Sequence, residues 1–399
     1  MGMEDAVIAG VGETGKRRPK TVEEWRSLEE LYAEATRLTL AGTGLSVADV
    51  EGLGVIDAAV ETPPIYAGRL AETLGFEDLR WTVGVDTGGS SALSLLAQGA
   101  LAVDAGVVDT FLCLGADAPV DPRRDDAELF PRDPSGYVKN YLDPFGTQGP
   151  NSRLAHVQTV HMDEHGTTRE QLAEVSVVQR RHAALNPLAY LDDPIEVEDY
   201  LDCPPIADPV GLLDCVIPVD AGFGVLLVSG ERAAGLDVEP VHLAGFGECT
   251  NHDTGDPPDV TTTGMAAAGP AAFEGAGVGP DDVDFVQLYD DYPVVVAMQL
   301  EDLGYCEKGA GGPFLAGTDL AYDGTLPLNT GGGQLSVGQS GMAAGFVQLC
   351  EGVRQLQGAG GDRQVPGATR GLVTGLGGVA YGKNLRHASA AVLEAGVAT

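Results

Sequence analysis

Two helices that are apolar on nearly every face constrain the fold of this chain more than any other feature. The first follows a Gly-rich turn in VDTGGSSALSLLAQGALAVDAG, residues 85–106, and the second lies in SGMAAGFVQL, residues 340–349. A helix without a polar face has to be covered all round, so both are expected to be buried between other layers.

Segments of strand length alternate with helical segments on either side of these two helices. Strands are predicted in DAVIAGVGET, VEGLGVIDA and VVDTFLCLGAD in the first half, and in TRGLVTGLGGVAYG and ASAAVLEAG near the end. The alternation indicates an α/β protein with buried strands. Each half has a Gly turn, a buried helix and later strands, so the chain is expected to form five layers, α/β/α/β/α, from two similar halves.

The predicted halves are separated by an inserted region. We assign residues 1–118 and 205–240 to the N-terminal half and 241–399 to the C-terminal half. Residues 119–204 form an inserted loop region rich in Pro, Asp and Gly, with one helix in TTREQLAEVSVVQRRHAALNP that Thr167 or Thr168 can cap. Pro293 is expected to start a further helix in the C-terminal half.

The charge of the chain excludes several classes of partner. The 59 acidic and 23 basic residues give a net charge of -36. Nucleic acid and anionic membrane surfaces would be repelled. We interpret this composition as that of an extreme halophile, in which molar salt shortens the Debye length to about 3 Å and screens the self-repulsion.

Cysteine and hydropathy patterns predict a cytoplasmic protein. The six cysteines are scattered without a CxxC pair, which suits a reducing compartment and argues against a disulfide framework and a zinc knuckle. No apolar run reaches the length of a membrane span, and no signal peptide is recognised. The spacing of His156, His161 and His165 does not favour one helical face, so no metal site is predicted.

Several long motifs resemble the thiolase superfamily, and more narrowly its sterol-carrier-protein-x type thiolases and thiolase-like relatives. They occur in the order HMDEHGTTREQLAEVSVVQRRHAALNP, LYDDYPVVVAMQLEDLGYCEKG, LPLNTGGGQLSVGQSG, CEGVRQLQGAGGDRQVPGA and TGLGG. The resemblance implies an active site between the halves at the ends of the buried helices. It also implies a coenzyme A thioester as substrate, no further cofactor, and a homodimer.

At the family's nucleophile position this chain has no cysteine. That position falls near Gly89, followed by Ser90 and Ser91. A serine at a helix N-terminus can be a nucleophile if a base lies beside it. The alternative is that one of these hydroxyls only caps the helix.

The other catalytic positions implied by the resemblance are changed as well. The histidine of the family's HD-x-F motif falls at Tyr289, with Asp290 next to it, and the histidine of its G-H-P motif falls at Gln339. Tyrosine can act as a general acid only if its pKa, ordinarily about 10, is lowered. Gln339 cannot take a proton but can donate a hydrogen bond. Either Asp290 or the next aspartate can instead cap the helix that begins at the following proline.

Glycines and further polar residues complete the expected substrate site. The family's Gly-rich turn falls at Asn329 and at Gly331, Gly332 and Gly333, whose backbone is expected to lie near the acyl group. The second catalytic cysteine falls near Val373 or Thr374, before Gly377 and Tyr381, the last a second phenol for the site.

Three functions follow from the resemblance. The first is an acyltransferase, acetyl-CoA acetyltransferase-like, acting on a β-ketoacyl-CoA. The second is a retro-aldolase acting on a β-hydroxyacyl-CoA together with a small partner that carries a zinc ribbon and an OB fold. A retro-aldol step needs a base and enolate stabilisation but no covalent nucleophile. The third is a non-catalytic acyl-CoA-binding subunit.

Overall fold

A single mixed β-sheet runs through the computed structural model, which describes residues 5–58, 66–123, 140, 143–147, 149–255, 257–378, 385 and 387–396. Within these residues nine strands pair in the order β3-β2-β4-β7-β1-β8-β11-β10-β9. The strands are β1 (Ala6–Glu13), β2 (Gly52–Ile56), β3 (Trp81–Val85), β4 (Thr110–Asp117), β7 (Ala221–Ser229), β8 (Val241–Thr250), β9 (Phe285–Gln287), β10 (Arg370–Gly377) and β11 (His387–Ala395).

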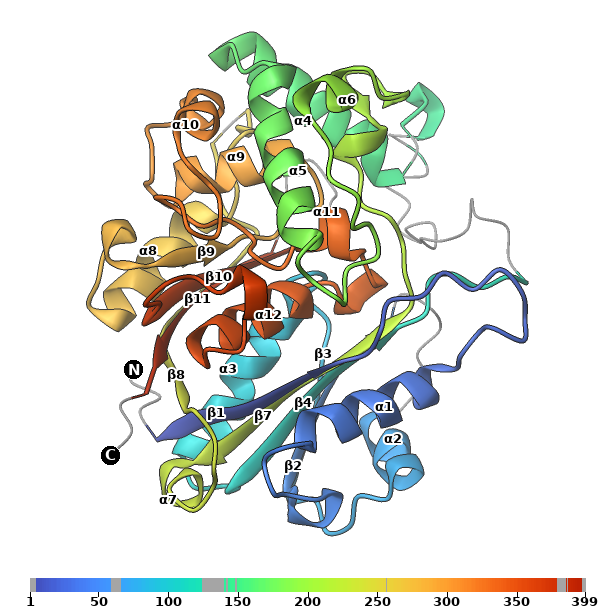
Figure 1. Cartoon of the computed structure of the whole chain (residues 1–399), viewed down its shortest axis with the longest axis vertical. Coiled ribbons are helices and arrows are strands. Elements are labelled where there is room, and N and C mark those ends of the chain that lie inside the picture. Colours follow the sequence, from blue (N-terminus) through green and yellow to red (C-terminus); the bar gives the residue numbers. More distant parts are fainter. Residues whose placement is uncertain are drawn as a thin grey trace.

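The sheet consists of two halves that fold around two central helices, as Figure 1 shows. Helices α3 (Ser91–Asp104) and α12 (Phe346–Leu356) lie between the halves and contact strands of both. Helix α1 (Leu28–Leu40) covers the outer face of one half and α8 (Met265–Ala276) that of the other. The expected α/β layering is therefore confirmed. One difference is that the halves are joined, because β1 and β8 pair through two residue pairs.

The remaining helices lie outside this central layer or cap it. They are α2 (Tyr66–Leu74), α4 (Gly149–His165), α5 (Arg169–Ala183), α6 (Val197–Leu201), α7 (Gly230–Ala233), α9 (Pro293–Asp302), α10 (Gly311–Gly317) and α11 (Gly333–Val337). The short strands β5 (Pro205–Ala207) and β6 (Val210–Gly211) form a separate pair that contacts α4.

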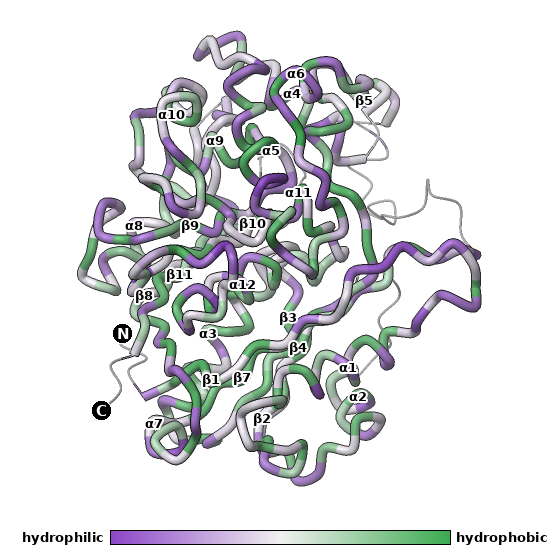
Figure 2. The backbone as a smooth tube through the Cα atoms, in the orientation of Figure 1, coloured by the Kyte–Doolittle hydropathy of each residue, from purple (hydrophilic) through white to green (hydrophobic). Residues whose placement is uncertain are grey.

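Hydropathy follows the layers. Figure 2 shows hydrophobic residues along the strands and the central helices, and hydrophilic residues along the outer turns. A glycine explains how α3 fits so closely on its sheet: a Cβ on Gly99 would lie 2.7 Å from a ring carbon of Phe111 on β4. Close packing of this kind leaves no room for a larger residue.

The local signals for helix ends are confirmed. The Thr168 hydroxyl accepts the N–H of Gln171 at 3.3 Å, and Gln171 Oε1 accepts the N–H of Thr168 at 3.0 Å. These two bonds form a capping box on α5. Pro293 is the first residue of α9. Helix α4 was not predicted, because its apolar residues do not gather on one face.

The apolar helix expected after the Gly-rich turn at 331–333 is interrupted. Residues 333–356 form α11, a 3-10 turn at Gly341–Ala343, and then α12. Gly338 and Gly341 have φ of 103° and 51°, a backbone conformation that ends a right-handed helix. The buried run therefore turns twice before α12 begins.

No helix in the described ranges is long and apolar enough to cross a membrane.

Candidate active site

The turn before α3 is packed directly against the ring of Tyr289. A Cβ built on Gly89 would overlap the phenol oxygen and two ring carbons of Tyr289. On the other side, a Cβ on Gly377 would overlap the carbonyl oxygen of Thr87. Gly89 and Gly377 are thus required by close contacts within the protein, and the space for a side chain at position 89 is filled by the phenol.

Ser90 and Ser91 are fully buried, and neither hydroxyl contacts a basic group. Ser90 Oγ lies 2.5 Å from Ser389 Oγ on β11. Ser91 Oγ accepts the backbone N–H of Thr87 at 2.9 Å. The capping alternative is wrong for Ser90, since this residue is the N-cap of α3 but its side chain makes no cap bond. Without a base, neither serine has the environment of an activated nucleophile.

Tyr289 follows β9 and is held by its backbone. Its N–H donates to Thr374 Oγ1 at 2.9 Å, and its carbonyl accepts from the Gln299 amide at 2.6 Å. Thr374 in turn donates to Gln299 Oε1 at 2.6 Å. Thr374, one of the two residues at the family's second cysteine position, therefore serves to fix Tyr289.

The phenol of Tyr289 stays protonated. Burial raises its pKa well above 10, and the charges of Asp291 and Asp290 raise it further, while a hydrogen bond from Gln334 opposes this. This is the opposite of the lowered pKa that we required of a general acid at neutral pH. The group can nevertheless donate a hydrogen bond, and it can protonate a carbanion, which is far more basic than a phenolate.

Asp290 is buried and anchors the start of α11. Its carboxylate accepts the backbone N–H groups of Gln334 at 2.9 Å and Leu335 at 3.2 Å, and the Gln348 amide at 2.5 Å. A Cβ on Gly333 would overlap Asp290 Oδ2, so this glycine is required there. Burial raises the pKa of Asp290 to about 7 against the lowering by these hydrogen bonds. Both carboxylate oxygens of Asp290 therefore already accept hydrogen bonds from within the protein.

The expectation that Asp290 or Asp291 caps α9 is wrong, since the N-cap is Tyr292 and no side chain makes a cap bond there. Asp291 has the more available carboxylate of the two. Its side chain is partly exposed, and its Oδ1 atom is buried without a hydrogen-bond partner. Burial and the charge of Asp290 raise the pKa of Asp291 to about 7, while a hydrogen bond with Tyr289 lowers it. A carboxylate with a pKa near neutrality is suited to act as a general base. The only signal in the sequence was the doubled aspartate of YDDY, which does not say which carboxylate is free.

The Gly-rich turn at 331–333 packs against the C-terminal end of α5 and the residues that follow it. Asn329, with φ of 47°, joins the turn to the end of β9: its amide accepts the N–H of Leu288 at 2.6 Å and donates to the carbonyl of Leu288 at 2.9 Å. Gly331 accepts from the Asn186 amide at 2.7 Å, and a Cβ on Gly332 would lie 2.8 Å from Ala183. These residues hold α5 and the turn together.

Gln339 faces its own loop. Its amide donates to the carbonyl of Gly341 at 3.2 Å and accepts the N–H of the same residue at 3.2 Å. Its backbone pairs with residues 217 and 219, so the loop is fixed next to β7. The next residue, Ser340, is fully buried, and its Oγ has no partner. Tyr381 lies outside the described residues.

Several residues described above have buried polar atoms without a hydrogen-bond partner. They are Asp291 Oδ1, Gln334 Oε1, Ser340 Oγ and both amide atoms of Gln179. Gln179 and Asp290 both lie within 2.6 Å of the position that a Cβ on Gly333 would take. Buried polar groups normally find partners, so each of these atoms could accept or donate a hydrogen bond to water or to a bound molecule. The described residues contain no group of three His, Cys, Asp or Glu side chains that could hold a metal ion.

Comparison with known proteins gives matches over nearly the whole chain. Residues 247–394 match a family described as thiolase C-terminal domain-like. A steroid side-chain-cleaving aldolase of Thermomonospora curvata is 32% identical over 88% of this chain and 90% of its own length. A 17-hydroxy-3-oxo-4-pregnene-20-carboxyl-CoA lyase of Mycobacterium tuberculosis is 31% identical over 94% of this chain and 97% of its own. An acetyl-CoA acetyltransferase of Methanothermobacter thermautotrophicus is 30% identical over 94% and 97%.

Solved structures agree with the described architecture. A structure described as an Ltp2-ChsH2(DUF35) aldolase superposes with a TM-score of 0.84 at 30% identity, covering 98% of both chains. A monomeric SCP2-thiolase like protein of Mycobacterium smegmatis superposes with a TM-score of 0.71 at 21% identity, covering 98% of this chain and 78% of its own, a likeness of fold.

Proposed function

Because the chain belongs to the thiolase superfamily, and within it to the SCP2-type thiolase-like proteins, we propose that it acts on the carbon–carbon bond of an acyl-CoA as a retro-aldolase. The substrate is a β-hydroxyacyl-CoA, and the products are a ketone or aldehyde and a shortened acyl-CoA. The observation that carries this proposal is the phenol of Tyr289 in the space where a nucleophile on residue 89 would stand.

The proposed reaction needs two proton transfers. Asp291 takes the proton of the β-hydroxyl, the bond between Cα and Cβ breaks, and Cβ becomes a carbonyl carbon. The electron pair of that bond moves to Cα as the enolate of the thioester. The Tyr289 phenol donates its proton to Cα.

A proton transfer between Asp291 and Tyr289 restores the resting protonation state of both side chains. The tyrosinate left after protonation of Cα recovers a proton from the protonated Asp291, to which it is hydrogen-bonded. Atoms and charge balance over the cycle, and the chemistry uses only these two side chains and the substrate's own thioester. Asp290, bound to the start of α11, acts as a positioning residue for Tyr289 and Asp291.

Among the relatives, the acetyl-CoA acetyltransferase supports the alternative reaction, acyl transfer from a β-ketoacyl-CoA. That reaction needs a nucleophile at the start of α3. Position 89 has no side chain, and the Ser90 hydroxyl is engaged with Ser389 on the buried side of the helix. The geometry of the described residues therefore favours aldol cleavage.

The proposal includes a small second subunit. The structurally similar aldolase is described together with a DUF35 partner. We propose an equivalent partner for this chain, with a zinc ribbon and an OB fold, because the chain has no CxxC pair of its own. A homodimer is also proposed: β3 is an edge strand of the sheet, and its Trp81 is 44% exposed. We also propose that the protein works in the cytoplasm of a halophile.

The test is a product analysis with two substrates. The purified protein, with and without its small partner, is incubated with a β-hydroxyacyl-CoA and, separately, with acetoacetyl-CoA plus CoA. Release of a ketone or aldehyde from the first, without acetyl-CoA from the second, supports the aldolase. The opposite result supports the acyltransferase. Binding of both thioesters without turnover of either supports the non-catalytic subunit and overturns the proposal.

A further inference from the structure

Two of the six cysteines are brought together by the β5–β6 pair. Cys203 lies between α6 and β5, and Cys215 directly follows the 3-10 turn at Leu212–Asp214. Between them the chain reverses direction, with Pro205 paired to Gly211 in the antiparallel sense. The reversal returns the end of this segment to the place where it began.

Gly211 contacts both thiols. A Cβ built on this glycine would lie 2.6 Å from Cys203 Sγ. The Cys215 thiol donates to the carbonyl oxygen of the same glycine, with 3.4 Å between sulfur and oxygen. The carboxylate of Asp214 fixes the glycine by accepting its N–H at 2.7 Å. Both sulfur atoms therefore lie against one residue, which has no side chain to separate them.

A guanidinium lies beside Cys203. Arg169, the first residue of α5, has one nitrogen 3.9 Å from Cys203 Sγ. The same group lies over the Tyr200 ring, 5.3 Å from its centre, and donates to the carbonyl of Tyr200 at 3.2 Å, so its position is fixed. Cys203 is partly exposed, between the exposed residues Asp202 and Pro204. A partly exposed thiol next to a fixed cation has the surroundings of a reactive cysteine.

Cys215 has different surroundings. Burial raises the pKa of its thiol to about 12, and the charges of Asp214 and Cys203 contribute to this rise. That the charge of Cys203 acts on Cys215 agrees with the contact of both thiols with Gly211. Cys215 therefore stays protonated at neutral pH, and Cys203 is the thiol that reacts first.

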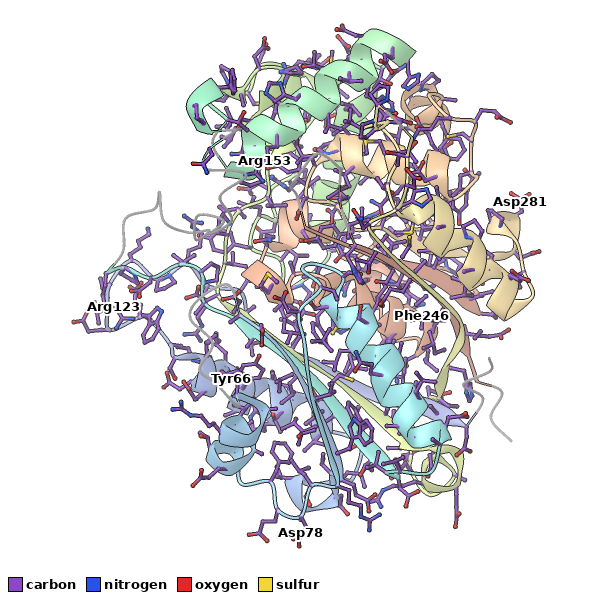
Figure 3. The ribbon with its side chains drawn as sticks, turned by 180° about the vertical axis from the view of Figure 1, so that it is seen from behind. Tyr66, Asp78, Arg123, Arg153, Phe246 and Asp281 are labelled. Atoms are coloured by element: carbon purple, nitrogen blue, oxygen red, sulfur yellow. The ribbon has the colours of Figure 1, made fainter. Side chains whose placement is uncertain are left out.

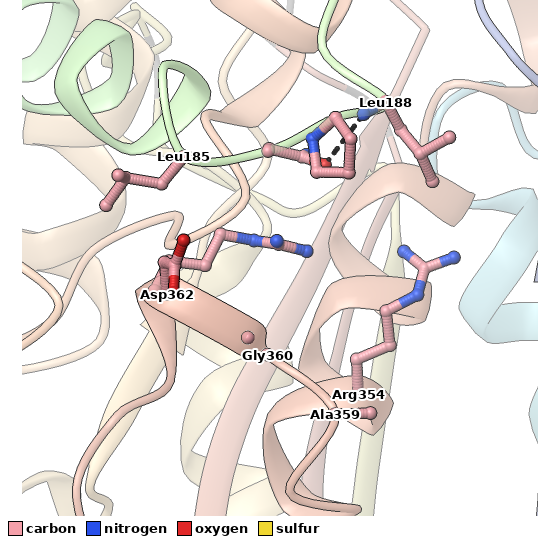
Figure 4. Close-up of a pocket in the computed structure, with 10 residues that line it drawn as sticks. Leu185, Leu188, Arg354, Ala359, Gly360 and Asp362 are labelled. Carbon is pink, nitrogen blue, oxygen red and sulfur yellow. Dashed lines mark hydrogen bonds between the residues drawn. The ribbon is translucent and has the colours of Figure 1, made fainter.

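Cys350 shows that an arginine nearby is not sufficient for a reactive thiol. Cys350 is fully buried on α12, and burial raises its pKa to about 12. Arg354, one turn later, points toward the loop that carries Leu188 in Figure 4 and donates to Glu13 at 2.5 Å. That guanidinium is thus bound to a carboxylate, and the thiol behind it is closed to solvent. Cys203 differs on both points.

The β5–β6 pair lies at one end of the molecule. It contacts α4, and Figure 3 shows α4, on which Arg153 is labelled, at the end opposite Asp78. The neighbouring residues Ile206 and Leu212 are 46% and 50% exposed. A small oxidant can therefore reach Cys203 directly from solvent.

Cys215 connects the two thiols to the candidate site. It lies close enough to Tyr292 for its charge to raise the pKa of that phenol, which burial already raises well above 10. Tyr292 directly follows Asp291 and is the N-cap of α9. Its hydroxyl donates to Asn151 Oδ1 on α4 at 2.5 Å. A change at Cys215 therefore acts on the residue next to the proposed base.

We propose that Cys203 and Cys215 form a redox-active pair, which hydrogen peroxide oxidises from two thiols to a disulfide. The Cys203 thiolate attacks one oxygen of the peroxide, the O–O bond breaks, and Cys203 becomes a sulfenic acid. The other oxygen leaves as hydroxide and recovers the proton that Cys203 had lost. The sulfur of Cys215 then displaces the sulfenic hydroxyl, which takes the Cys215 proton and leaves as water. Two electrons pass from the two sulfur atoms to the peroxide.

The disulfide is reversible and acts on the site through Tyr292. A reducing compartment keeps the pair as thiols at rest, and a dithiol reductant breaks the bond by thiol–disulfide exchange. Formation of the bond draws the Cys215 sulfur from the Gly211 carbonyl toward Cys203, which changes the packing beside Tyr292. We therefore expect lower turnover in the oxidised form. This effect on turnover rests on the proposed function, whereas the disulfide does not.

The direct test is mass spectrometry of the full chain after treatment with hydrogen peroxide. Remaining thiols are blocked with N-ethylmaleimide, and the chain is digested without reduction. We expect the peptide that contains both cysteines to be unlabelled and lighter by the hydrogens lost from the two thiols, and dithiothreitol to restore both labels. The control is Cys249→Ser, which removes a partly exposed thiol on β8 and should leave this result unchanged. Labelling of both Cys203 and Cys215 after peroxide treatment, or a bond to another cysteine instead, would overturn the proposal.

Two single variants test the order of events. In Cys215→Ser the Cys203 sulfenic acid has no second thiol, so dimedone should trap it, whereas in Cys203→Ser peroxide should leave Cys215 unmodified. Without oxidant, N-ethylmaleimide should label Cys203 at least about tenfold faster than Cys215. Faster labelling of Cys215 would contradict the assigned roles. Cys203→Ser, which changes the more exposed thiol, keeps the test available if Cys215→Ser does not fold.

Turnover of a β-hydroxyacyl-CoA separates the modification from the reaction. Peroxide should lower kcat of wild type, dithiothreitol should restore it, and Cys203→Ser should keep the same kcat under both conditions. An unchanged kcat in fully oxidised wild type would overturn the link to the candidate site. If reduced wild type shows no turnover, the proposed function fails, and the peptide analysis still decides whether the disulfide forms.

Discussion

The phenol ring of Tyr289 occupies the place that the side chain of residue 89 would need. The two residues are two hundred positions apart in the chain, and a Cβ on Gly89 would overlap the phenol oxygen. A glycine at the start of α3 and a tyrosine after β9 are therefore one structural unit. In the proposed reaction, this unit puts a phenol where a side chain on residue 89 would otherwise stand.

Gly89→Ala should damage the protein through that contact. The added methyl has to displace the Tyr289 ring, and overpacking of this kind costs about 1–3 kcal/mol. We expect a lower free energy of unfolding and loss of turnover, measured by denaturant titration and product assay. Gly317→Ala is the control, because no atom lies within 4 Å of a Cβ built there. An unchanged Gly89→Ala protein would show that the phenol does not pack as described.

The two adjacent aspartates should behave differently. Asp291→Asn is expected to leave the fold intact and to lower kcat by about a hundredfold or more, the usual contribution of a general base. Asp290→Asn should instead lower stability by about 1–3 kcal/mol, since an amide has one acceptor oxygen for the N–H groups that the carboxylate now binds. Thermal unfolding and kcat on the same samples measure both. Equal kcat losses with equal stability losses would contradict the division of roles.

Activity should depend on the ionised form of Asp291. Its pKa is raised to about 7, so kcat should increase as pH rises through that value and level off above it. The pH–rate profile of wild type checks this. A flat profile between pH 5 and 9 would show that another group is the base.

Whereas kcat should rise with pH, the stability of the folded state should fall as pH rises through 7. The pKa values of Asp220, Asp290 and Asp291 are each raised to about 7, mainly by burial, so the folded state binds these protons more tightly than the unfolded state. Their contribution is complete below about pH 4 and is lost as pH rises through 7. Glu13 and Glu301, with pKa values lowered to about 2, contribute above about pH 4.5 and lose this contribution as pH falls toward 2.

Between pH 5 and 8 the melting temperature should therefore fall. Asp220→Asn should reduce that slope, because it removes one of the three groups. A melting temperature that rises steadily from pH 5 to 8 in wild type would contradict the raised pKa values.

Salt should stabilise the fold. With a net charge of -36, self-repulsion is strong in dilute buffer and is screened in molar KCl. The free energy of unfolding should increase from 0.1 M to 2 M KCl, and a matched series in glycerol controls for viscosity. Maximal stability in dilute buffer would remove the halophilic interpretation.

Part of the order of strands and helices was predictable because local signals decide it, although α4 and β3 (Trp81–Val85) were not predicted. The capping box of Thr168 and the helix start at Pro293 are short-range features, and both are found where the sequence predicted. The same holds for the buried α3. The break between α11 and α12 was missed, because apolar composition alone does not show how Gly338 turns the backbone.

The chemistry of the site was less predictable because it depends on contacts between distant residues. Ser90 could be either a nucleophile or a cap from its local sequence, and its bond to Ser389 joins residues 299 positions apart. The direction of the Tyr289 pKa follows from burial and from two neighbouring charges. Likewise, the division between Asp290 and Asp291 follows from the N–H groups of α11, which come from a segment more than 40 residues away.

The most direct test of the account is the cleavage of a β-hydroxyacyl-CoA by Tyr289→Phe beside Ser90→Ala. We predict that release of the ketone or aldehyde is lost in Tyr289→Phe, which retains the ring packed on Gly89 but lacks the proton. Ser90→Ala should retain that release, since its hydroxyl contacts only Ser389 among the described residues. Cleavage that persists in Tyr289→Phe and disappears in Ser90→Ala would contradict the account.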